Sequence, residues 1–496
     1  MSAAARLMDG YPSGRAFDEA IAGDGSVRAP YRDVIAWLEG YGAREFARRR
    51  QLIELVFRNQ GITFTVYGDD LGTERSFPFD PVPRLITAPE WAAIDAGLRQ
   101  RVRALNLFLA DVYGERQVLA DGVVPPDLVL RNPAYRPALR GVAVPHGVYT
   151  HVVGTDLIRD EQGRFLVLED NLRVPSGVSY MLANRAAMTR SFPRMMEATP
   201  VRPVRHYPVA LLECLRGLSP RDVPDPTVVV LTPGPYNAAY FEHAFLAQQM
   251  GVELVEGRDL LVDDGRLWMR TTQGRRQVDV VYRRVDDDFL DPAAFRADSV
   301  LGVRGLVDAV AGGRVALANA IGTGVADDKA MYTYVPELIR YYLGEAPLLP
   351  NVPTWRCGDP GVLEQVERDA ASLVIKEVGG AGGYGMLVGP ESDAATRLTY
   401  LAQVRADPGR YIAQPVVQLS THPTFDPESQ RLVPRHVDLR PYVLVGEDIT
   451  IVPGGLTRVA LKAGSLVVNS SQGGGSADTW VLEADAADAV GGDGAC

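Results

Sequence analysis

The sequence predicts an α+β fold made of several packed units. Three patterns along its 496 residues support this prediction. Residues 1–125 are mainly amphipathic helix, residues 141–172 are strand-like, and residues 207–290 are apolar strands separated by a helix. Because chains of this length usually divide into units with separate cores, we expect more than one domain.

The composition excludes several classes of protein. Hydrophobic residues make up 46% of the chain, charged residues 23%, and the formal net charge is -11, so nucleic acid is not an expected partner. No apolar run reaches the length of a membrane span and no secretory signal opens the chain, so we expect a cytoplasmic protein that does not bind a membrane. Cys214, Cys357 and Cys496 form neither a disulfide framework nor a zinc site.

The first 125 residues are expected to be helical and to carry no chemical motif. Helical periodicity covers residues 31–59 and 89–122, and one strand-like run, ITFTVYG, lies between them. Three consecutive arginines at 48–50 are interpreted as a solvated helix face.

A predicted β-hairpin ends in polar side chains. Its second strand, RFLVLEDN, is apolar until it reaches Glu169, Asp170 and Asn171. Alternation along a strand places Glu169 and Asn171 on one face, together with Phe165 and Val167, and turns Asp170 to the other face.

The register of this hairpin decides whether its acids meet. With the turn at Glu161–Gln162, Asp156 lies opposite Val167 and becomes a diagonal neighbour of Glu169. Asp156, Glu169 and Asn171 would then form an all-oxygen set of the kind that holds Mg²⁺. A surface hairpin with solvated acids is the alternative, and this segment alone leaves both interpretations open.

A second candidate site is the glycine-rich stretch LVIKEVGGAGGYGM. An apolar strand delivers Lys376, and five glycines follow before the next strand: Gly379, Gly380, Gly382, Gly383 and Gly385. Glycines let backbone N–H groups approach an anion, and a lysine on the adjacent strand adds a charge suited to phosphate oxygens. The stretch is neither a P-loop nor a dinucleotide fingerprint, and a flexible hairpin without a ligand is the alternative.

The C-terminal strands offer a third group of polar residues. The apolar run RYIAQPVVQ contains Gln414 and Pro415, and proline restricts it to a sheet edge or a strand end, where backbone groups can meet a purine. Four further polar residues follow at strand ends or beside a second glycine loop: Arg440, Arg458, Asn469 and Gln472. Phosphate binding and ordinary surface charge both remain open for this group.

Residues 207–290 are predicted to form a small βαβ layer. The buried strand TVVVLTPGP is followed by the helix AAYFEHAFLAQQMG, by the strand VELVEG and, after a hairpin, by the strand VDVVYRRVD. The last residues, 483–496, are small, acidic and glycine-containing, and we expect them to be disordered.

Taken together, these motifs resemble the ATP-grasp fold in a circularly permuted order. The lysine and glycine loop usually precede the Glu-x-Asn strand, but here LEDNLRVPSGVSY stands about two hundred residues before VIKEVGGAGGYGM. This order is similar to that of permuted ATP-grasp proteins related to glutathionylspermidine synthetase. The resemblance covers roughly residues 80–482 and rests most on LEDNLRVPSGVSY and NSSQGGGSADTW.

The resemblance implies a division of the chain into five parts. These are a helical N-terminal region (1–125), an ATP-grasp lobe with the metal-binding hairpin (126–205), a Rossmann-like preATP-grasp lobe (206–325), a nucleotide-binding lobe with the C-terminal strands (326–482) and a tail (483–496).

The resemblance also implies roles for individual residues. Mg²⁺ would be held by Asp156, Glu169 and Asn171. ATP would be contacted by Lys329, by Lys376, by the glycines of the loop from Gly379 to Gly385, by a hinge at Gln414, Pro415 and Val416, and by Asn469 and Gln472. The acid substrate or its acyl-phosphate would meet Arg173 together with Arg440 or Arg458.

The implied activity is the ATP-dependent joining of a carboxylate to an amine through an acyl-phosphate, with ATP and Mg²⁺ as cofactors. The partners would be a small-molecule or peptide acid and an amine, neither of which the sequence identifies, and no protein partner is predicted. Two alternatives stay open: an ATP-binding scaffold or sensor without catalysis, and an ATP-dependent kinase without ligation.

Overall fold

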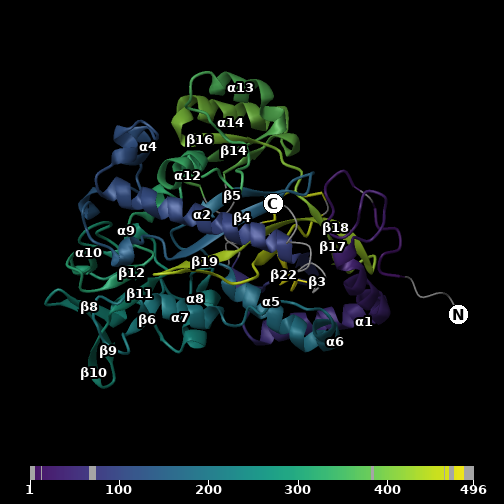
Figure 1. Cartoon of the computed structure of the whole chain (residues 1–496), viewed down its shortest axis with the longest axis horizontal. Helices are drawn as coiled ribbons and strands as arrows, with labels where there is room; N and C mark the ends of the chain where they lie inside the picture. Colours follow the sequence, from purple (N-terminus) through teal and green to yellow (C-terminus); the bar gives the residue numbers. More distant parts are fainter. Residues whose placement is uncertain are drawn as a thin grey trace, which may run out of the picture.

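A computed structural model describes residues 6–12, 14–65, 74–380, 385–462, 464–468 and 474–484. A mixed sheet of nine strands in these residues forms the centre of the molecule (Figure 1). The strands are β3 (Phe79–Ile86), β4 (Val152–Arg159), β5 (Phe165–Asn171), β17 (Thr421–Asp426), β18 (Arg431–Arg440), β19 (Tyr442–Val445), β20 (Ile449–Ile451), β21 (Leu456–Val459) and β22 (Gly475–Val481). Their order is β20-β19-β4-β18-β21-β22-β3, with β5 paired to β4 and β17 paired to β18.

Helices cover both faces of this sheet. Helix α2 (Ala88–Tyr113) crosses one face, where its Leu98 and Leu105 share a core with Leu157 and Val167 (Figure 1). A separate core on the other face is built from Trp480 of the sheet together with helices α1 (Arg32–Asn59), α5 (Val178–Ser191), α6 (Pro193–Ala198), α7 (Tyr207–Arg216) and α8 (Tyr240–Met250). The hairpin β4–β5 therefore has one face closed by α2.

The N-terminal part supplies a strand that the sequence did not predict. Strand β3 pairs with β22 in parallel at the edge of the large sheet, although it contains Pro81 and Pro83. Proline cannot donate a ladder hydrogen bond, which lowers the strand signal, but an edge strand tolerates it. The expectation of a single strand-like run in residues 1–125 was therefore wrong: β1 (Thr63–Thr65) also has a partner, β2 (Glu74–Ser76).

A parallel four-stranded sheet confirms the predicted βαβ unit. Its order is β12-β11-β6-β7, and α8 connects β6 to β7. The strands are β6 (Val228–Leu231), β7 (Glu253–Val255), β11 (Val280–Arg283) and β12 (Ala316–Ala318). Between β7 and β11 lies a small antiparallel sheet of β8 (Leu260–Asp263), β9 (Arg266–Thr271) and β10 (Gly274–Gln277), and α9 (Asp287–Leu290) and α10 (Leu306–Ala311) precede β12.

A smaller lobe stands above the large sheet in Figure 1. Its antiparallel sheet has the order β13-β16-β14-β15 and its own hydrophobic core. The elements are β13 (Trp355–Arg356), α13 (Val362–Asp369), β14 (Leu373–Glu377), β15 (Leu387–Val388), α14 (Ala394–Ala406) and β16 (Tyr411–Pro415). Pro415 ends β16, as its effect on strand pairing predicts.

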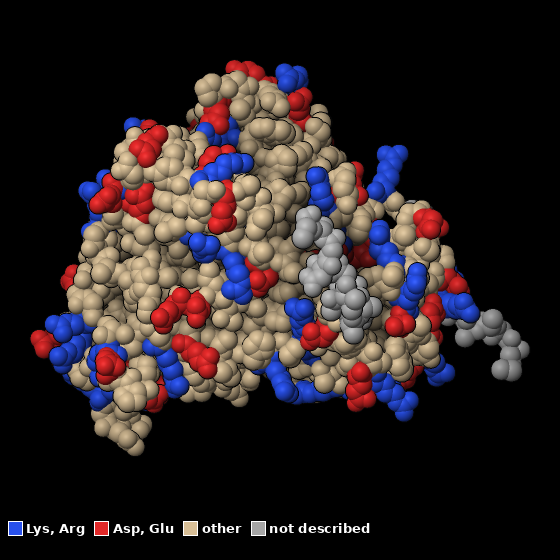
Figure 2. Space-filling view, viewed as in Figure 1, with Lys and Arg blue, Asp and Glu red and all other residues tan. Residues whose placement is uncertain are grey.

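The remaining α-helices of the described residues are short: α3 (Gln117–Ala120), α4 (Pro126–Leu130), α11 (Lys329–Tyr332) and α12 (Val335–Leu343). None of the helices in the described ranges combines the length and hydrophobicity needed to cross a bilayer. Figure 2 shows acidic and basic side chains interspersed over the visible face, without a continuous patch of one sign.

Candidate functional site

The hairpin β4–β5 brings two carboxylates opposite each other. Its chain reverses so that Arg159 pairs with Phe165, which shifts the pairing by one residue from the predicted register. A β-bulge then shifts the pairing by one further residue, because Leu157 pairs with Val167 while Asp156 pairs directly with Glu169. The expectation of a diagonal pair was therefore wrong, and the two acids are closer neighbours than predicted.

The bulge also changes which side chains share a face. Leu168 is the extra residue, and both Leu168 and Glu169 line a cavity, whereas Val167 is buried in the core beneath α2. The predicted grouping of Glu169 with Val167 was wrong, because the bulge interrupts the alternation. The opposite orientation of Asp170 is confirmed: its carboxylate accepts hydrogen bonds from Arg101 of α2.

The cavity lies between the large sheet and the smaller lobe. It is lined by many of the residues singled out in the sequence: Asp156, Glu169, Lys329, Lys376, Gly380, Gln414, Pro415, Val416 and Arg458. Part of its wall is an apolar cluster that includes Ile158, Leu168, Val352, Leu419 and Val468. Residues separated by about three hundred positions in the sequence thus surround one space that has a charged side and an apolar side.

Two lysines face the carboxylates. Lys329 Nζ lies 3.6 Å from Glu169 Oε2 and donates a hydrogen bond to the carbonyl oxygen of Gly380. Lys376 Nζ donates to Gln414 Oε1 at 2.8 Å, and Gln414 in turn donates to Thr354. Burial lowers the pKa of Lys376, Glu169 opposes that shift, and the charge of Lys329 adds to it. An anion that reached both lysines would favour their charged forms.

Two arginines stand behind Asp156. Arg440 donates from Nη2 to Asp156 Oδ2 at 2.7 Å, and Arg458 Nη2 donates to the same oxygen at 2.6 Å. Burial alone would raise the pKa of Asp156, but Arg440 and Arg458 outweigh it and hold that pKa well below its usual range. Arg458 also pairs with Asp438, whose pKa burial raises. Asp156 therefore stays ionised at neutral pH.

The remaining predicted residues lie beside this cavity or outside the described residues. Arg173 pairs with Asp327 at 3.2 Å, and Asn171 donates from Nδ2 to the Gly154 carbonyl at 3.1 Å. Within the described chain, Arg173, Arg440, Asn171, Gly379 and Gly385 are not among the residues that line the cavity. Gly382, Gly383, Asn469 and Gln472 lie outside the described residues.

The donor set suits a hard cation. The described residues contain no group of three or more His, Cys, Asp or Glu side chains that could hold a metal ion by themselves. Asp156 and Glu169 are nevertheless direct cross-strand partners, and Asn171 follows on the same strand. One or two carboxylates together with phosphate oxygens are the usual protein environment of Mg²⁺, so this all-oxygen set fits that ion.

Asn319 holds the open end of the hairpin and was not singled out in the sequence. Its Oδ1 accepts from the backbone N–H groups of His151 and Val152 at 2.7 and 2.8 Å. Its Nδ2 donates to the carbonyls of Val152 and Leu172 at 2.8 and 2.9 Å. A polar residue directly after the apolar run VALA was the available signal, because side chains at the carboxyl ends of parallel strands often serve sites there.

A second set of hydrogen bonds connects helices α5 and α8 to Arg440. Glu242 of α8 accepts hydrogen bonds from the backbone N–H groups of Gly177 and Ser179 at the start of α5, at 2.7 and 3.1 Å. The preceding carbonyl, that of Ser176, accepts from Arg440 Nη1 at 3.2 Å. The orientation of Arg440 therefore depends on the contact between α5 and α8.

Comparisons with known proteins agree with this architecture. The family described as circularly permuted ATP-grasp type 2 matches residues 83–460. Uncharacterized proteins of Synechocystis sp. and Mycobacterium tuberculosis are each 52% identical to the chain, covering 96% of it and 99% and 86% of their own lengths. A solved structure of a glutathione synthetase-like effector from Globodera pallida has a TM-score of 0.56 at 11% identity, covers 88% of this chain and 96% of its own, and shows likeness of fold alone.

Two of the similar proteins, both from Frankia species, have names that refer to a reaction. A putative glutamate–cysteine ligase 2-3 of Frankia alni is 45% identical over 477 residues, which are 96% of this chain and 54% of the Frankia protein. The chain thus spans about half the length of that relative.

Proposed function

The chain belongs to the circularly permuted ATP-grasp type 2 family, and from this premise we propose that it is an ATP- and Mg²⁺-dependent carboxylate–amine ligase. One observation carries the proposal: the carboxylates of Asp156 and Glu169 lie in one cavity with the side chains of Lys329 and Lys376. In phosphoryl transfer, negative charge on the transferred group must be neutralised from several sides. Carboxylates that bind a metal ion, placed opposite lysines that bind phosphate, provide this neutralisation.

ATP would span the two sides of the cavity. Its adenine would lie beside the end of β16, at Gln414 to Val416, against the apolar cluster that contains Val352 and Leu419. Its phosphates would reach Lys329 and Lys376. In this pose Lys376 Nζ would exchange its neutral acceptor, Gln414 Oε1, for a phosphate oxygen, a stronger charge-assisted bond.

Asp156, Glu169 and Asn171 would hold Mg²⁺, which when bound neutralises charge on the phosphate that is transferred. A carboxylate ligand must be deprotonated, and Arg440 and Arg458 keep Asp156 in that state. Arg458 also lines the cavity, so its guanidinium is proposed to contact the acid substrate. Arg440 acts from behind Asp156, and Arg173 from beyond the end of β5.

The proposed reaction has two steps. A carboxylate oxygen of the acid attacks the γ-phosphorus, the bond to the β–γ bridging oxygen breaks, and ADP leaves. The amine nitrogen then attacks the acyl carbon, phosphate leaves with the electron pair of the C–O bond, and the nitrogen loses a proton. The protein contributes positioning and electrostatic stabilisation, for which the side chains of this cavity are sufficient without a covalent nucleophile.

A screen for ADP release tests this function. Mg-ATP and the full chain are incubated with amino acids, short peptides and polyamines, singly and in pairs, beginning with glutamate and cysteine because of the Frankia relative's name. We expect ADP release that requires both an acid and an amine. Release with an acid alone would identify a kinase, and ATP binding without release under any pair would identify a scaffold or sensor.

A further inference from the structure

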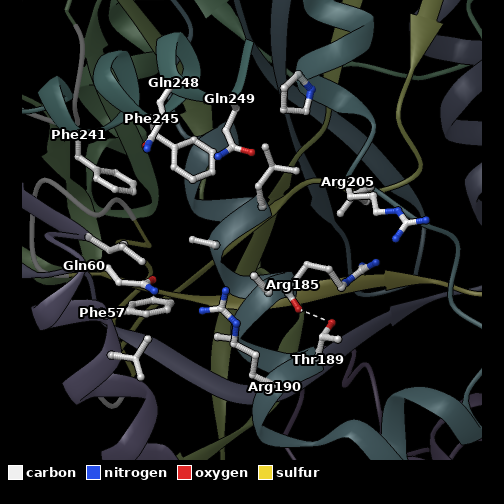
Figure 3. Close-up of a pocket in the computed structure, with 18 of the residues that line it drawn as sticks. Phe57, Gln60, Arg185, Thr189, Arg190, Arg205, Phe241, Phe245, Gln248 and Gln249 are labelled. Atoms are coloured by element: carbon white, nitrogen blue, oxygen red, sulfur yellow. Dashed lines mark hydrogen bonds between the residues drawn. The ribbon is translucent and has the colours of Figure 1, made fainter. Parts of the chain in front are cut away.

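A second cavity lies among the helices on the face of the sheet opposite α2. It has a volume of about 910 Å³ and is walled by α1, α5, α8 and the segment 201–208 (Figure 3). Of the residues that the structure describes, none lines both this cavity and the cavity that contains Asp156 and Glu169. The proposed ligase reaction therefore gives it no role.

The walls of this cavity are apolar. The aromatic side chains of Phe57, Phe241 and Phe245 line it, and the last two pack with ring centroids 5.6 Å apart. Ile62, Leu182, Met196 and Val204 add aliphatic surface. Cavities of roughly 300–1,000 Å³ with mostly apolar walls are typical of sites for small organic ligands.

The charged side chains that line the cavity in the described part of the chain are of one sign. Among the residues that the structure describes, its lining includes Arg185, Arg190 and Arg205 but no Asp or Glu, in a chain whose net charge is -11. Arg185 is already paired with Asp478, at 2.8 Å. In the described part of the chain neither Arg190 nor Arg205 has an ion-pair or side-chain hydrogen-bond partner, and Figure 3 shows Arg190 extending from α5 into the cavity.

The helices that form the cavity are held together without a ligand. Glu242 of α8 caps the start of α5, and Arg284 pairs with Glu242 at 3.3 Å from the parallel sheet, with both side chains fully buried. Because this contact fixes α5 against α8, the space between Phe245 and Arg190 further along these helices is preformed.

We propose that this cavity is a binding site for an anionic amphiphile, in which an acyl chain lies between α1, α5 and α8 and its carboxylate meets Arg190. An apolar body alone would leave Arg190 without a counter-charge. A small polar anion alone would leave the phenylalanine walls hydrated, which costs free energy in proportion to their area. A ligand with both parts matches both features.

Calorimetry with sodium dodecanoate, below its micellar concentration, tests the site on the full chain. We expect saturable binding of one dodecanoate per chain. Arg190→Gln should weaken it at least tenfold, because a charge-assisted contact is lost. Ala186→Trp should also weaken it at least tenfold, since Ala186 is an exposed lining residue and the indole would occupy the space of the chain without disturbing a core.

Arg194→Gln is the matched control. Arg194 is exposed on α6 and lies near Arg190 in the sequence, but it does not line this cavity, so its loss removes the same charge and should leave the affinity unchanged. Binding as tight for dodecanol as for dodecanoate, or unchanged affinity in both Arg190→Gln and Ala186→Trp, would overturn the proposal. None of these measurements depends on ATP turnover, so failure of the ligase screen leaves their outcome unaffected.

Discussion

The adjacent acids Glu169 and Asp170 lie on opposite faces of the hairpin β4–β5 and differ in burial and in ion pairing. Asp170 faces α2, where Arg101 donates to both of its carboxylate oxygens at 2.7–2.9 Å and the two side chains are 2% and 1% exposed. Glu169 faces the cavity, its side chain is 29% exposed, and its nearest cations, Lys329 and Arg440, lie 3.6 and 3.9 Å away. One acid is fully neutralised inside the fold, whereas the other is left with capacity to bind.

The contrast shows how a stable fold can present a carboxylate that is only weakly paired. A buried carboxylate without a close partner is costly, so the face that must be closed contains a bidentate ion pair. The face that opens to the cavity can leave its carboxylate partly hydrated, because water stabilises it until a ligand arrives. The following experiments test this division, beginning with the largest expected effect.

Glu169→Gln should abolish function without affecting the fold. The change removes the charge of a proposed metal ligand whose ion pairs, with Lys329 and Arg440, are long at 3.6 and 3.9 Å, so we expect the ADP release rate to fall by about 100- to 1000-fold. Calorimetric titration should show that Mg²⁺ no longer tightens ATP binding. The melting temperature should stay close to that of the native protein, and a large drop would assign Glu169 to stability instead.

Asp170→Asn should have the opposite effects: lower stability and unchanged Mg-ATP binding. Removing one charge of a fully buried ion pair leaves Arg101 uncompensated, so the free energy of unfolding should fall by about 3 kcal/mol in urea titrations. Mg-ATP affinity of the folded variant should be retained. Asp127→Asn is the control, because it breaks an exposed pair with Arg131 and should cost less than about 1 kcal/mol. Loss of Mg²⁺ dependence in Asp170→Asn would show that the two faces are not separate.

The variants Asn319→Ala and Asn106→Ala test whether the open end of the hairpin positions the proposed metal ligands. Asn106 accepts from the N–H groups of Tyr149 and Thr150, so both asparagines hold the approach to β4, but Asn319 also holds the end of β5 through Leu172. Both changes should lower the free energy of unfolding by about 1–3 kcal/mol. Only Asn319→Ala should also weaken Mg²⁺-dependent ATP binding, by about tenfold. Equal effects of both variants on that binding would remove the positioning role.

The pH dependence of ATP binding should reflect the protonation of Lys376, and we expect this effect to be the smallest of those predicted here. Burial lowers its pKa, so its positive charge is lost at a lower pH than that of an ordinary lysine. ATP affinity should therefore be greatest below that pKa and decline as pH rises through it. In Lys376→Arg the guanidinium stays charged, and the decline should move to higher pH. The same decline of ATP affinity with pH in the native protein and in Lys376→Arg would assign the titration to another group.

The sequence predicted which polar side chains end the hairpin better than it predicted how the two strands pair. The polar end of an apolar strand was visible in LVLEDN, and so was the separation of Glu169 from Asp170, because both follow from composition and alternation. The pairing of Asp156 with Glu169 was not, since a bulge depends on how two strands fit the rest of the sheet.

Supports from distant segments were the hardest to predict. Arg101, Asn319 and Glu242 each act on the hairpin or on the start of α5 across long sequence separations, and no local pattern encodes such contacts. Strand β3 was missed for a related reason: its prolines weaken the local strand signal, and only its place at the sheet edge makes them acceptable.

The bulge at Leu168 has a consequence for how this segment can vary among relatives. Strand β5 has one residue more than β4 between the turn and the acids, so a one-residue deletion anywhere from Phe165 to Leu168 can be absorbed by losing the bulge. Asp156 would still pair with Glu169, and Asp170 would still face α2. A deletion after Glu169 cannot be absorbed by losing the bulge, and it would move the following side chains to the opposite face of the sheet. Gaps in homologous sequences should therefore be tolerated before Glu169 and absent from Glu169 to Asn171.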